Sequence, residues 1–473
     1  MLLCEMNYKS YFDSIAPNWL KYRRQHSYYW RELNKFVGFY MSPDSSVLEV
    51  GCATGEALAM LPGRRKVGID FCESLVEQGR KIYGDQIEFH VMDAQSISLD
   101  EKFDVIFLSN LVTYLPDVET VLNQLRPLCH PQTRLIVTNF NKLWEPAITL
   151  AELVGIKRRC PQQNWLSVED MKGLLYLAGF ETYRINSSML MPLNIPIFSY
   201  LLNRFVAHMP LMGSLSLNHF LFARPRPSDE DGWQRRYSVT VVVPARNESG
   251  NIHDAIERIP DMGSHTEIIF VEGNSTDDTW DVIQQEAKAS SRDIKYMQQD
   301  GRGKGDAVRK GYAAASGDIL MILDADLTVP PEDLPKFYKA IATGKGEFIN
   351  GVRLVYPMEK GSMRFLNTIG NHFFSRLFSW ILETPVKDTL CGTKVMFRED
   401  YLRLAAGRSF FGEFDPFGDF DLLFGAHKLN LKITDLPIRY RERTYGDTNI
   451  SRFRHGFLLL QMSAFAALKI RFR

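Results

Sequence analysis

The sequence predicts two α/β domains in succession. Twice along the chain, over 46–139 and over 238–323, apolar and β-branched runs end in glycine- or acid-containing turns and lead into helical patterns. Such an alternation is typical of a largely parallel sheet flanked by helices. At 473 residues the chain exceeds one ordinary core. The polar, proline-containing stretch at 224–232 marks the boundary, so we expect domains at 1–227 and 237–473 and a linker at 228–236.

The composition excludes several classes of protein. The chain is 45% hydrophobic and 24% charged, which is typical of a globular protein and not of a disordered one. Lysine plus arginine and aspartate plus glutamate number 56 each, so the net charge gives no sign of a nucleic-acid partner.

Cysteine usage and hydropathy indicate the compartment. The six cysteines are scattered and form no Cys-x-x-Cys pair, which favours a reduced, cytoplasmic location. The first residues lack a basic stretch followed by an apolar one, so no signal peptide is expected. No run supplies the roughly 20 apolar residues of a membrane span. We expect a cytoplasmic protein whose membrane contact, at the inner face, is peripheral.

The first domain opens with a helical, aromatic segment, Tyr8 to Tyr40, and continues into a strand, Val47 to Val50. A turn containing Gly51 and Gly55 follows, and a helix begins at Glu56. Glycine permits unusual dihedral angles and close backbone approach, and a helix N-terminus leaves N–H groups free for a ligand's carboxylate.

Acidic residues end the next two strands. Lys66 to Asp70 and Ile87 to Asp93 each read as a strand that stops at a carboxylate. In a Rossmann-like unit the first of these acids can accept both ribose hydroxyls, and the second suits an adenine amino group. Further strands are expected at 103–110 and 134–139, and a last one at 217–223.

This order resembles the class I S-adenosylmethionine-dependent methyltransferases over about residues 10–225. The resemblance implies a Rossmann-like sheet and S-adenosylmethionine as the cofactor. The residues it places around the methionine, ribose and adenine moieties are Glu49, Gly51, Gly55, Asp70, Asp93 and Ala94.

The sequence does not identify the methyl acceptor. Asn110 and Tyr114 follow the fourth strand, and the aromatic and basic faces at 22–24 and 28–29 are alternatives. An amphipathic helix expected over Ile197 to Met209 either covers the site, touches a bilayer or is buried within the domain.

The second domain repeats the strand-to-helix order. Ser238 to Val243 forms a strand stopped by Pro244, and a helix follows from Asn251. Further strands are expected at 267–272 and 295–299, with helices from Thr279 and over 306–315.

Two carboxylates end the next strand, Ile319 to Leu323, which is continuously apolar. Asp324 and Asp326 are two residues apart, so on an extended chain they point the same way. Ligands of open α/β sheets bind at the carboxyl ends of strands, where a divalent ion held by this pair could bind a diphosphate.

These motifs together resemble the family 2 glycosyltransferases with the GT-A fold over about 237–450, and within them the polyprenyl-phosphate sugar synthases of the dolichyl-phosphate mannose type. The resemblance implies a nucleotide-diphosphate sugar as donor and Mg²⁺ or Mn²⁺ bound by Asp324 and Asp326. It places the following residues on the substrate: Pro244, Arg246, Glu248, Glu272 and Lys304. Gly273 departs from the family, which often has a second acid there, so the nucleotide is left open.

The acceptor side has two alternatives. An alcohol acceptor needs a carboxylate base, which Asp419 or Asp421 could provide. A phosphate acceptor needs only cations, and Lys394 and Arg443, with Arg452 and Arg454, could supply them.

Two apolar helices with basic flanks, expected over 364–382 and 457–470, suit either a lipid headgroup boundary or a core or subunit interface. The chain therefore reads as a bifunctional enzyme that transfers methyl groups and, with inversion, sugars to a polyprenyl phosphate or a saccharide. The alternative is a glycosyltransferase with a catalytically silent, regulatory or anchoring methyltransferase-like module.

Overall fold

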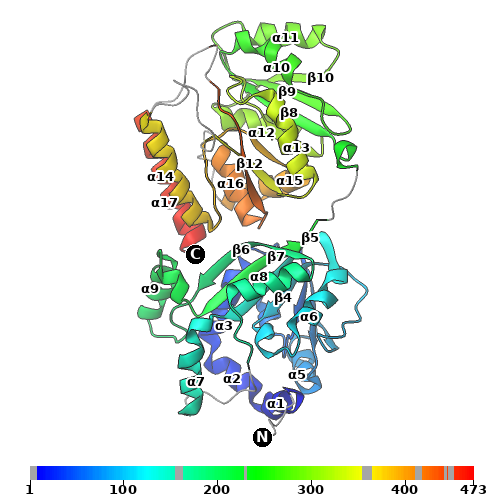
Figure 1. Ribbon diagram of the computed structural model, residues 1–473, viewed down its shortest axis with the longest axis vertical. Coiled ribbons are helices and arrows are strands. Elements are labelled where there is room, and N and C mark those ends of the chain that lie inside the picture. The colour runs from blue at the N-terminus through cyan, green and yellow to red at the C-terminus, as the bar shows by residue number, and fades with distance from the viewer. Residues whose placement is uncertain are drawn as a thin grey trace. The chain divides into compact units, whose positions relative to one another are not determined.

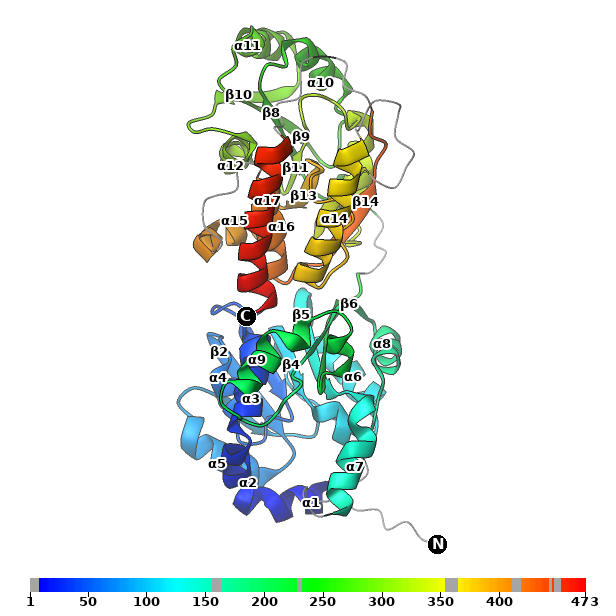
Figure 2. The same ribbon diagram turned by 90° about the vertical axis from the view of Figure 1, so that its left-hand side faces the viewer.

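The computed structural model forms two compact units, residues 1–226 with 472–473 and residues 227–471 (Figures 1 and 2). The residues it describes are 8–154, 163–227, 232–353, 365–410, 418–441, 445 and 452–473. Both units are α/β, which confirms the predicted fold class.

The first unit contains a seven-stranded sheet in the order β3-β2-β1-β4-β5-β7-β6. Its first five strands run parallel, and β7 is antiparallel to both β5 and β6. The strands are β1 (Ser46–Val50), β2 (Arg65–Asp70), β3 (Glu88–Val91), β4 (Phe103–Ser109), β5 (Cys129–Phe140), β6 (Phe180–Ser188) and β7 (Asn218–Pro225). The strand order reverses beside β1, so the carboxyl ends of β1 and β4 flank a crevice where ligands of such sheets bind.

Helices pack on this sheet and bury two apolar layers, one around Leu48 and Leu108 and the other around Val47 and Phe107. The α-helices are α1 (Tyr8–Ile15), α2 (Trp19–Gln25), α3 (Ser27–Gly38), α4 (Glu56–Met60), α5 (Glu73–Tyr83), α6 (Val118–Leu125), α7 (Glu145–Leu153), α8 (Val168–Leu177) and α9 (Phe198–Arg204). The helix expected over Ile197–Met209 is shorter than predicted, and a 3-10 turn, Val206–His208, follows it.

The second unit contains a seven-stranded mixed sheet in the order β10-β9-β8-β11-β13-β12-β14. Strands β8 to β11 run parallel, whereas β13 is antiparallel to its neighbours β11 and β12. The strands are β8 (Val239–Ala245), β9 (Thr266–Glu272), β10 (Asp293–Gln298), β11 (Ile319–Ile322), β12 (Phe348–Val352), β13 (Lys394–Phe397) and β14 (Ile433–Pro437). β9 and β11 are buried along their whole length, as their continuous apolar runs predict.

The α-helices of this unit are α10 (Ile252–Arg258), α11 (Thr279–Ala289), α12 (Lys304–Ala314), α13 (Leu334–Ala342), α14 (Phe365–Leu382), α15 (Arg398–Ala406), α16 (Asp419–Lys428) and α17 (Arg452–Ala466). Figures 1 and 2 both show α14 and α17 side by side, and α17 continues into a π-helical turn, Ala467–Arg471. Phe378, Leu459 and Ile470 of these elements join the core. Among the described residues, no helix combines the length and apolarity that crossing a bilayer requires.

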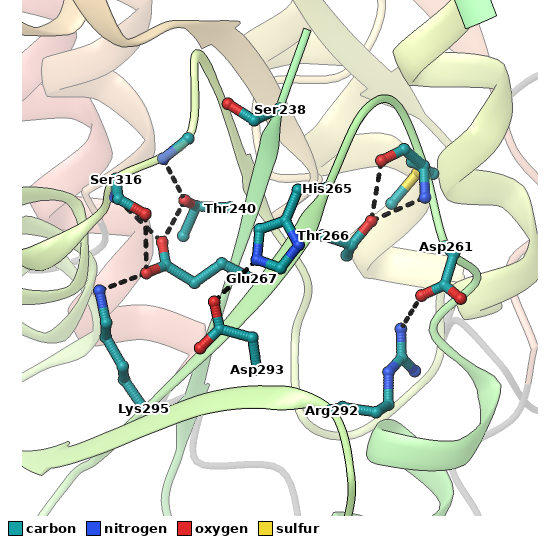
Figure 3. Close-up of polar contacts among 12 residues, drawn as sticks. Ser238, Thr240, Asp261, His265, Thr266, Glu267, Arg292, Asp293, Lys295 and Ser316 are labelled. Atoms are coloured by element: carbon teal, nitrogen blue, oxygen red, sulfur yellow. Dashed lines mark hydrogen bonds and ion pairs between the residues drawn. The ribbon is translucent and has the colours of Figure 1, made fainter. Parts of the chain in front are cut away.

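A buried carboxylate ties three strands together at the amino end of the second sheet (Figure 3). Glu267 of β9 is fully buried and accepts hydrogen bonds from the hydroxyl of Thr240 at 2.5 Å and from the backbone N–H of Ser316 at 3.0 Å. Lys295 of β10 forms an ion pair with it. Burial raises the pKa of Glu267, but Lys295, Ser316 and Thr240 lower it by more, so the carboxylate is ionised.

Glu267→Ala should lower the free energy of unfolding by about 2–3 kcal/mol, because buried donors would lose their acceptor. Since the pKa of Glu267 is lowered on folding, its stabilisation is present above its ordinary pKa of 4.5 and lost as the pH falls below it. Urea unfolding at pH 7 and at lower pH measures both effects. The matched control is Asp293→Ala, which removes the exposed ion pair with His265 shown in Figure 3 and should cost less than about 1 kcal/mol. Equal costs would contradict the structural role of Glu267.

Candidate active sites

In the second unit, an ion pair stands where β11 ends. The Nζ atom of Lys304, the first residue of α12, lies 2.6 Å from Oδ1 of Asp324. Both side chains are about a quarter exposed (25% and 29%), so a ligand can reach them. Burial lowers the pKa of Lys304, but attraction to Asp324 and Asp419 outweighs it and the pKa is raised. The lysine is therefore a fixed positive charge beside Asp324.

Asp326 has different neighbours. Its Oδ1 accepts hydrogen bonds from the backbone N–H of Thr328 at 3.1 Å and from the Thr328 hydroxyl at 2.8 Å. Leu327, between them, adopts a left-handed φ of 50°, so the chain turns sharply here. The two carboxylates predicted to share a cation thus contact separate partners, Lys304 for Asp324 and the following turn for Asp326.

Gly392, two residues before β13, packs closely against this ion pair. A Cβ atom added to Gly392 would lie 2.1 Å from Oδ2 of Asp324 and 2.2 Å from Nζ of Lys304. Only glycine leaves room for both side chains at this position. In the sequence Gly392 is part of the Asp-x-x-x-Gly segment at 388–392, but nothing there reveals that the glycine faces Asp324.

The first residue of α16 brings a second carboxylate toward the same pair. Asp419 is buried, and its Oδ1 lies 4.0 Å from Nζ of Lys394 and has no hydrogen-bond partner among the described residues. Burial raises the pKa of Asp419 although Lys304 and Lys394 oppose this effect. Lys394 is itself fully buried, and its Nζ donates to the carbonyl oxygen of Cys391.

Two glycines hold the helices of this cluster together. A Cβ atom on Gly418, which has φ 74°, would lie 2.6 Å from Cα of Gly305 in α12. This contact places Lys304 and Asp419, which begin α12 and α16, beside each other. The cluster of Lys304, Asp324, Lys394 and Asp419 is called the charge cluster below.

Asp421 does not join the charge cluster in the structure. Its Oδ2 accepts from Nε of Arg408 at 2.7 Å. Residues two apart on a helix point about 200° apart, so Asp419 and Asp421 face different surroundings. Arg443 lies outside the described residues, and nothing is described of the side chains of Arg452 and Arg454.

The structure contains a buried ion pair that the sequence did not predict, at the end of β12, the strand next to β13. Arg353, after β12, binds Asp388 with two hydrogen bonds of 2.7 and 2.9 Å, and its guanidinium lies 5.2 Å from the ring centroid of Tyr440. Burial raises the pKa of Asp388, but Arg353 lowers it by more. Asp388 begins the Asp-x-x-x-Gly segment, but nothing in the sequence indicates that it pairs with Arg353, 35 residues earlier.

The residues predicted to contact the nucleotide lie at or just after the carboxyl ends of β8 and β9, which are adjacent strands. Pro244 lies in β8 and Arg246 directly follows it. Glu248 is buried and accepts from Nδ2 of Asn251 at 2.7 Å. Glu272, at the end of β9, is also buried.

Hydrogen bonds hold Glu272 in place. Its Oε1 accepts from the backbone N–H of Ser275 at 2.5 Å and its Oε2 from Nε2 of Gln298 at 3.2 Å. A Cβ atom on Gly273 would lie 3.1 Å from Cβ of Arg246. Arg246 therefore packs over the position where a second acid would stand, which gives a physical reason for the glycine.

In the first unit, the glycine turn after β1 has the backbone that the sequence predicts. Gly51 and Gly55 have φ values of 75° and 76°. A Cβ atom would lie 2.6 Å from Leu111 at Gly51, and 2.6 Å from the ring of Phe89 at Gly55. Each glycine is required both by its dihedral angle and by its neighbour.

The acids at the ends of β2 and β3 lie at the same edge. Asp70 is nearly buried and accepts from the backbone N–H groups of Ala53 at 2.8 Å and Cys72 at 2.9 Å. Burial raises its pKa although these hydrogen bonds oppose the shift. Asp93 is exposed and accepts from the N–H of Gln95 at 2.8 Å, whereas Ala94 is buried.

Glu49, in β1, is buried, and its Oε2 has no hydrogen-bond partner among the described residues. Burial raises the pKa of Glu49 to about 8, although Arg23 and the N–H of Leu58 lower it. A carboxyl oxygen without a partner among the described residues is available to a ligand's polar group, as a donor when Glu49 is protonated and as an acceptor when it is ionised.

The stability of the first unit should fall as the pH rises from about 4.5 to 8. In this window Glu49 is protonated in the folded chain and ionised in the unfolded chain, so the folded state binds more protons. For each pH unit in this window, the ionisation of Glu49 should lower the free energy of unfolding by roughly 1.4 kcal/mol. Glu49→Gln cannot ionise and should lack this decrease. Urea unfolding of both proteins at pH 5, 6.5 and 8 measures it. Parallel pH curves for the two proteins would contradict the raised pKa.

A buried polar network lies beyond β4. The hydroxyl of Tyr29 accepts from Nδ2 of Asn110 and from Nδ2 of Asn218, each at 2.9 Å. Burial raises the pKa of Tyr29 although both amides oppose it, so the phenol stays protonated. Tyr114 instead contacts Phe12 of α1, with ring centroids 5.6 Å apart. Of the predicted acceptor-side residues, Asn110 and Tyr29 are thus brought together and Tyr114 lies against α1.

The described residues contain no group of three or more His, Cys, Asp or Glu side chains suited to a metal ion. Magnesium sites that act on nucleotides often use only one or two carboxylates and complete their coordination with phosphate oxygens and water. Asp324 and Asp326 fit such a site by donor chemistry, because both offer carboxylate oxygens at a sheet edge that a ligand can reach.

Two family models match the chain, a methyltransferase domain over residues 22–185 and glycosyl transferase family 2 over residues 240–404. Glycosyltransferase AglJ of Haloferax volcanii is 28% identical over 224 residues, which are 47% of this chain and 69% of that protein. A dolichol-phosphate mannosyltransferase of Pyrococcus furiosus is 36% identical over 109 residues, 22% of this chain and only 30% of that protein.

A solved structure also resembles the chain. Glucosyl-3-phosphoglycerate synthase from Mycobacterium tuberculosis, in complex with Mn²⁺, uridine-diphosphate-glucose and glycerol 3-phosphate, is 20% identical. The match has a TM-score of 0.37 and covers 50% of this chain and 80% of that one.

Proposed function

The chain carries a methyltransferase domain followed by a family 2 glycosyl transferase domain, and from this premise we propose a bifunctional enzyme. Its second domain transfers a sugar from a nucleotide-diphosphate donor to a polyprenyl phosphate, and its first domain transfers a methyl group from S-adenosylmethionine. The enzyme acts in the cytoplasm, at the inner face of the membrane.

The observation that carries the proposal for sugar transfer is the charge cluster at the carboxyl end of β11. Nucleotide binding is assigned to Pro244, Arg246, Glu248 and Glu272, which lie at or just after the carboxyl ends of β8 and β9, one and two strands from Asp324. A divalent ion, Mg²⁺ or Mn²⁺, held by Asp324 and Asp326, would neutralise the diphosphate as it leaves.

Lys304 would also stabilise the departing diphosphate. Its charge is fixed beside Asp324 and it is about a quarter exposed. A cation positioned before the reaction stabilises negative charge that develops on a leaving group without further reorganisation. A single in-line displacement by the acceptor inverts the configuration at the anomeric carbon.

A phosphate acceptor fits the cluster better than an alcohol. A phosphate is already an anion and needs a cation to orient it, which Lys304, about a quarter exposed, can provide. Asp419, the one predicted base in the cluster, has a raised pKa and lies beside Lys394. The dolichol-phosphate mannosyltransferase similarity supports a polyprenyl phosphate as the acceptor. A soluble saccharide is the second candidate, for which Asp419 would be the base.

The methyl-transfer proposal rests on the edge formed by β1, β2 and β3. Glu49, Gly51 and Gly55 are assigned to the methionine moiety, Asp70 to the ribose, and Asp93 with Ala94 to the adenine. The left-handed backbone of the two glycines supports this assignment, as does Oε2 of Glu49, which has no hydrogen-bond partner among the described residues. S-adenosylmethionine supplies the electrophilic methyl group, and the chain's residues bind and align it. A silent methyltransferase-like module is the alternative.

The test uses the full chain and three measurements. Nucleotide sugars are screened with Mn²⁺ by thermal shift, the stabilising donor is then assayed with polyprenyl phosphate and with free saccharides, and S-adenosylmethionine binding is measured by calorimetry. We expect a stabilising donor, transfer to polyprenyl phosphate and micromolar binding of S-adenosylmethionine. Transfer only to a saccharide would overturn the acceptor assignment. A chain that transfers sugar but does not bind S-adenosylmethionine would have the silent module.

A further inference from the structure

The segment between β6 and β7 exposes an unusual number of large apolar side chains. Nine of the 23 residues from 193 to 215 are large, apolar and between 44% and 88% exposed. Single exposed apolar residues are normal on soluble proteins, whereas groups of them mark interaction surfaces. This segment is called the apolar platform below. Its helix, α9, is drawn in green in Figures 1 and 2, and the 3-10 turns that follow it contact the edge strand β6.

Helix α9 has its polar side facing the protein. Ser199 and Asn203, four residues apart and thus on one side of the helix, are buried. Phe198 and Leu201, three residues apart on another side, are half exposed. A surface helix in water normally shows the opposite arrangement, with its apolar stripe on the core.

The two buried polar side chains form hydrogen bonds with backbone groups, and these bonds fix the rotation of α9 about its axis. Oδ1 of Asn203 accepts from the N–H groups of Leu190 at 2.8 Å and Met191 at 2.9 Å, and its Nδ2 donates to the Met191 carbonyl at 2.7 Å. Ser199 donates to the carbonyl of Leu193 at 2.6 Å. Rotating α9 to hide its apolar side would break these bonds inside the protein.

Two turns with unfavourable backbone angles carry the most exposed aliphatic side chains of the platform, Ile197 and Leu211. Ile197 has φ 66° and ψ −50°, with a hydrogen bond of 2.7 Å from the Phe198 N–H to the Pro196 carbonyl, which is a γ-turn. Leu211, after Pro210, has φ 70° and ψ −34°. These dihedrals are unfavourable for branched side chains, and such outliers cluster at functional surfaces. The two side chains are 76% and 88% exposed.

The charge of the platform has one sign. No aspartate or glutamate occurs from 182 to 228, and the one Arg or Lys between 189 and 217 is Arg204. Its guanidinium lies 5.4 Å from the ring centroid of Tyr200. Beside α9, Arg204 and Lys35 line a recess, which Glu32 also lines. Aromatic and basic side chains next to exposed apolar ones suit the headgroup level of an anionic bilayer.

We propose that the apolar platform, residues 193–215, docks the first domain onto an anionic phospholipid surface. The aliphatic tips at Ile197 and Leu211 enter the acyl boundary and Arg204 contacts lipid phosphate. A second copy of this chain fits the platform less well, because a two-fold interface of the same patch would bring the two Arg204 side chains together, and residues 193–215 contain no acid to pair with them. The proposal goes beyond the proposed function, since docking requires neither methyl nor sugar transfer.

The test is sedimentation of the full chain with vesicles of phosphatidylcholine alone or mixed with phosphatidylglycerol. The wild type should bind the mixed vesicles, and Leu211→Asp should weaken binding about tenfold or more, because a charge replaces an exposed aliphatic side chain that would enter the acyl boundary. The matched control is Leu177→Asp at the end of α8, where the leucine is 67% exposed and lies outside the platform. This control should bind as the wild type does.

Two further variants separate docking from misfolding. Leu211→Gly removes the side chain where glycine suits the backbone, so it should keep or raise the unfolding temperature while weakening vesicle binding. Arg204→Gln should reduce the preference for phosphatidylglycerol. Unchanged vesicle binding by Leu211→Asp, or an equal loss in Leu177→Asp, would overturn the proposal. So would a wild-type dimer that Leu211→Asp converts to a monomer without any effect on vesicle binding.

Discussion

Asp324→Asn should lower the rate of sugar transfer by about 10²–10³-fold, the usual effect of removing one preorganised electrostatic group from an active site. The substitution leaves the shape almost unchanged but removes the charge that pairs with Lys304 at 2.6 Å and that is assigned to the cation. Binding of S-adenosylmethionine should not change, because Glu49, Gly51 and Asp70 belong to the other unit. The measurement is sugar transfer at saturating donor together with calorimetry of S-adenosylmethionine.

The matched control is Asp318→Asn, at the opposite end of the same strand. Asp318 precedes β11 and accepts from the N–H and hydroxyl of Ser238 at 2.9 and 2.8 Å. Its substitution should leave the turnover within about twofold of the wild type. A transfer rate in Asp324→Asn as high as that of the control would refute the role assigned to the charge cluster.

Gly51→Val should abolish detectable binding of S-adenosylmethionine. The valine would need a left-handed φ of 75°, and its Cβ would stand 2.6 Å from Leu111. A strained dihedral of this kind costs about 1–3 kcal/mol, and the turn would shift away from the ligand to relieve the contact. Calorimetry measures the affinity, and circular dichroism verifies that the domain is folded.

Gly173→Ala is the control for a glycine substitution in the same domain. Gly173 lies inside α8, where a Cβ atom would meet nothing within 4 Å. Alanine there should raise stability by about 0.5–1 kcal/mol through its helix propensity and leave the cofactor affinity unchanged. Full affinity in Gly51→Val would exclude the glycine turn from the cofactor site.

The architecture was predictable wherever a strand is continuously apolar. The run at β11 matches its strand closely because a strand buried on both faces leaves this pattern, whereas Glu49 interrupts β1 and Glu267 and Glu272 limit the apolar part of β9. Strand β6 was not predicted, because Phe180–Ser188 is an edge strand with few apolar residues. The helix at Ile197–Met209 was predicted too long, since two prolines and strained turns divide that segment.

The site was predictable only as a set of candidates. The sequence could not show which of Asp419 and Asp421 lies near Lys394. That choice depends on how α16 is rotated about its axis, which the packing of the helix determines. The pairing of Asp324 with Lys304 and that of Arg353 with Asp388 join segments distant in sequence, and no local pattern reveals them. The contact between position 273 and Cβ of Arg246, which favours glycine there, is not visible in the sequence either.

The touching backbones of Gly305 and Gly418 limit how this transferase could be re-engineered. A chimaera that imports the helix beginning at Asp419 from another enzyme, to change the acceptor, would also import a residue at position 418. Any side chain there would push apart the starts of two helices whose glycines now lie within van der Waals contact. Under the proposed assignment of donor and acceptor sites, a successful graft would have to exchange the segments around 305 and 418 together.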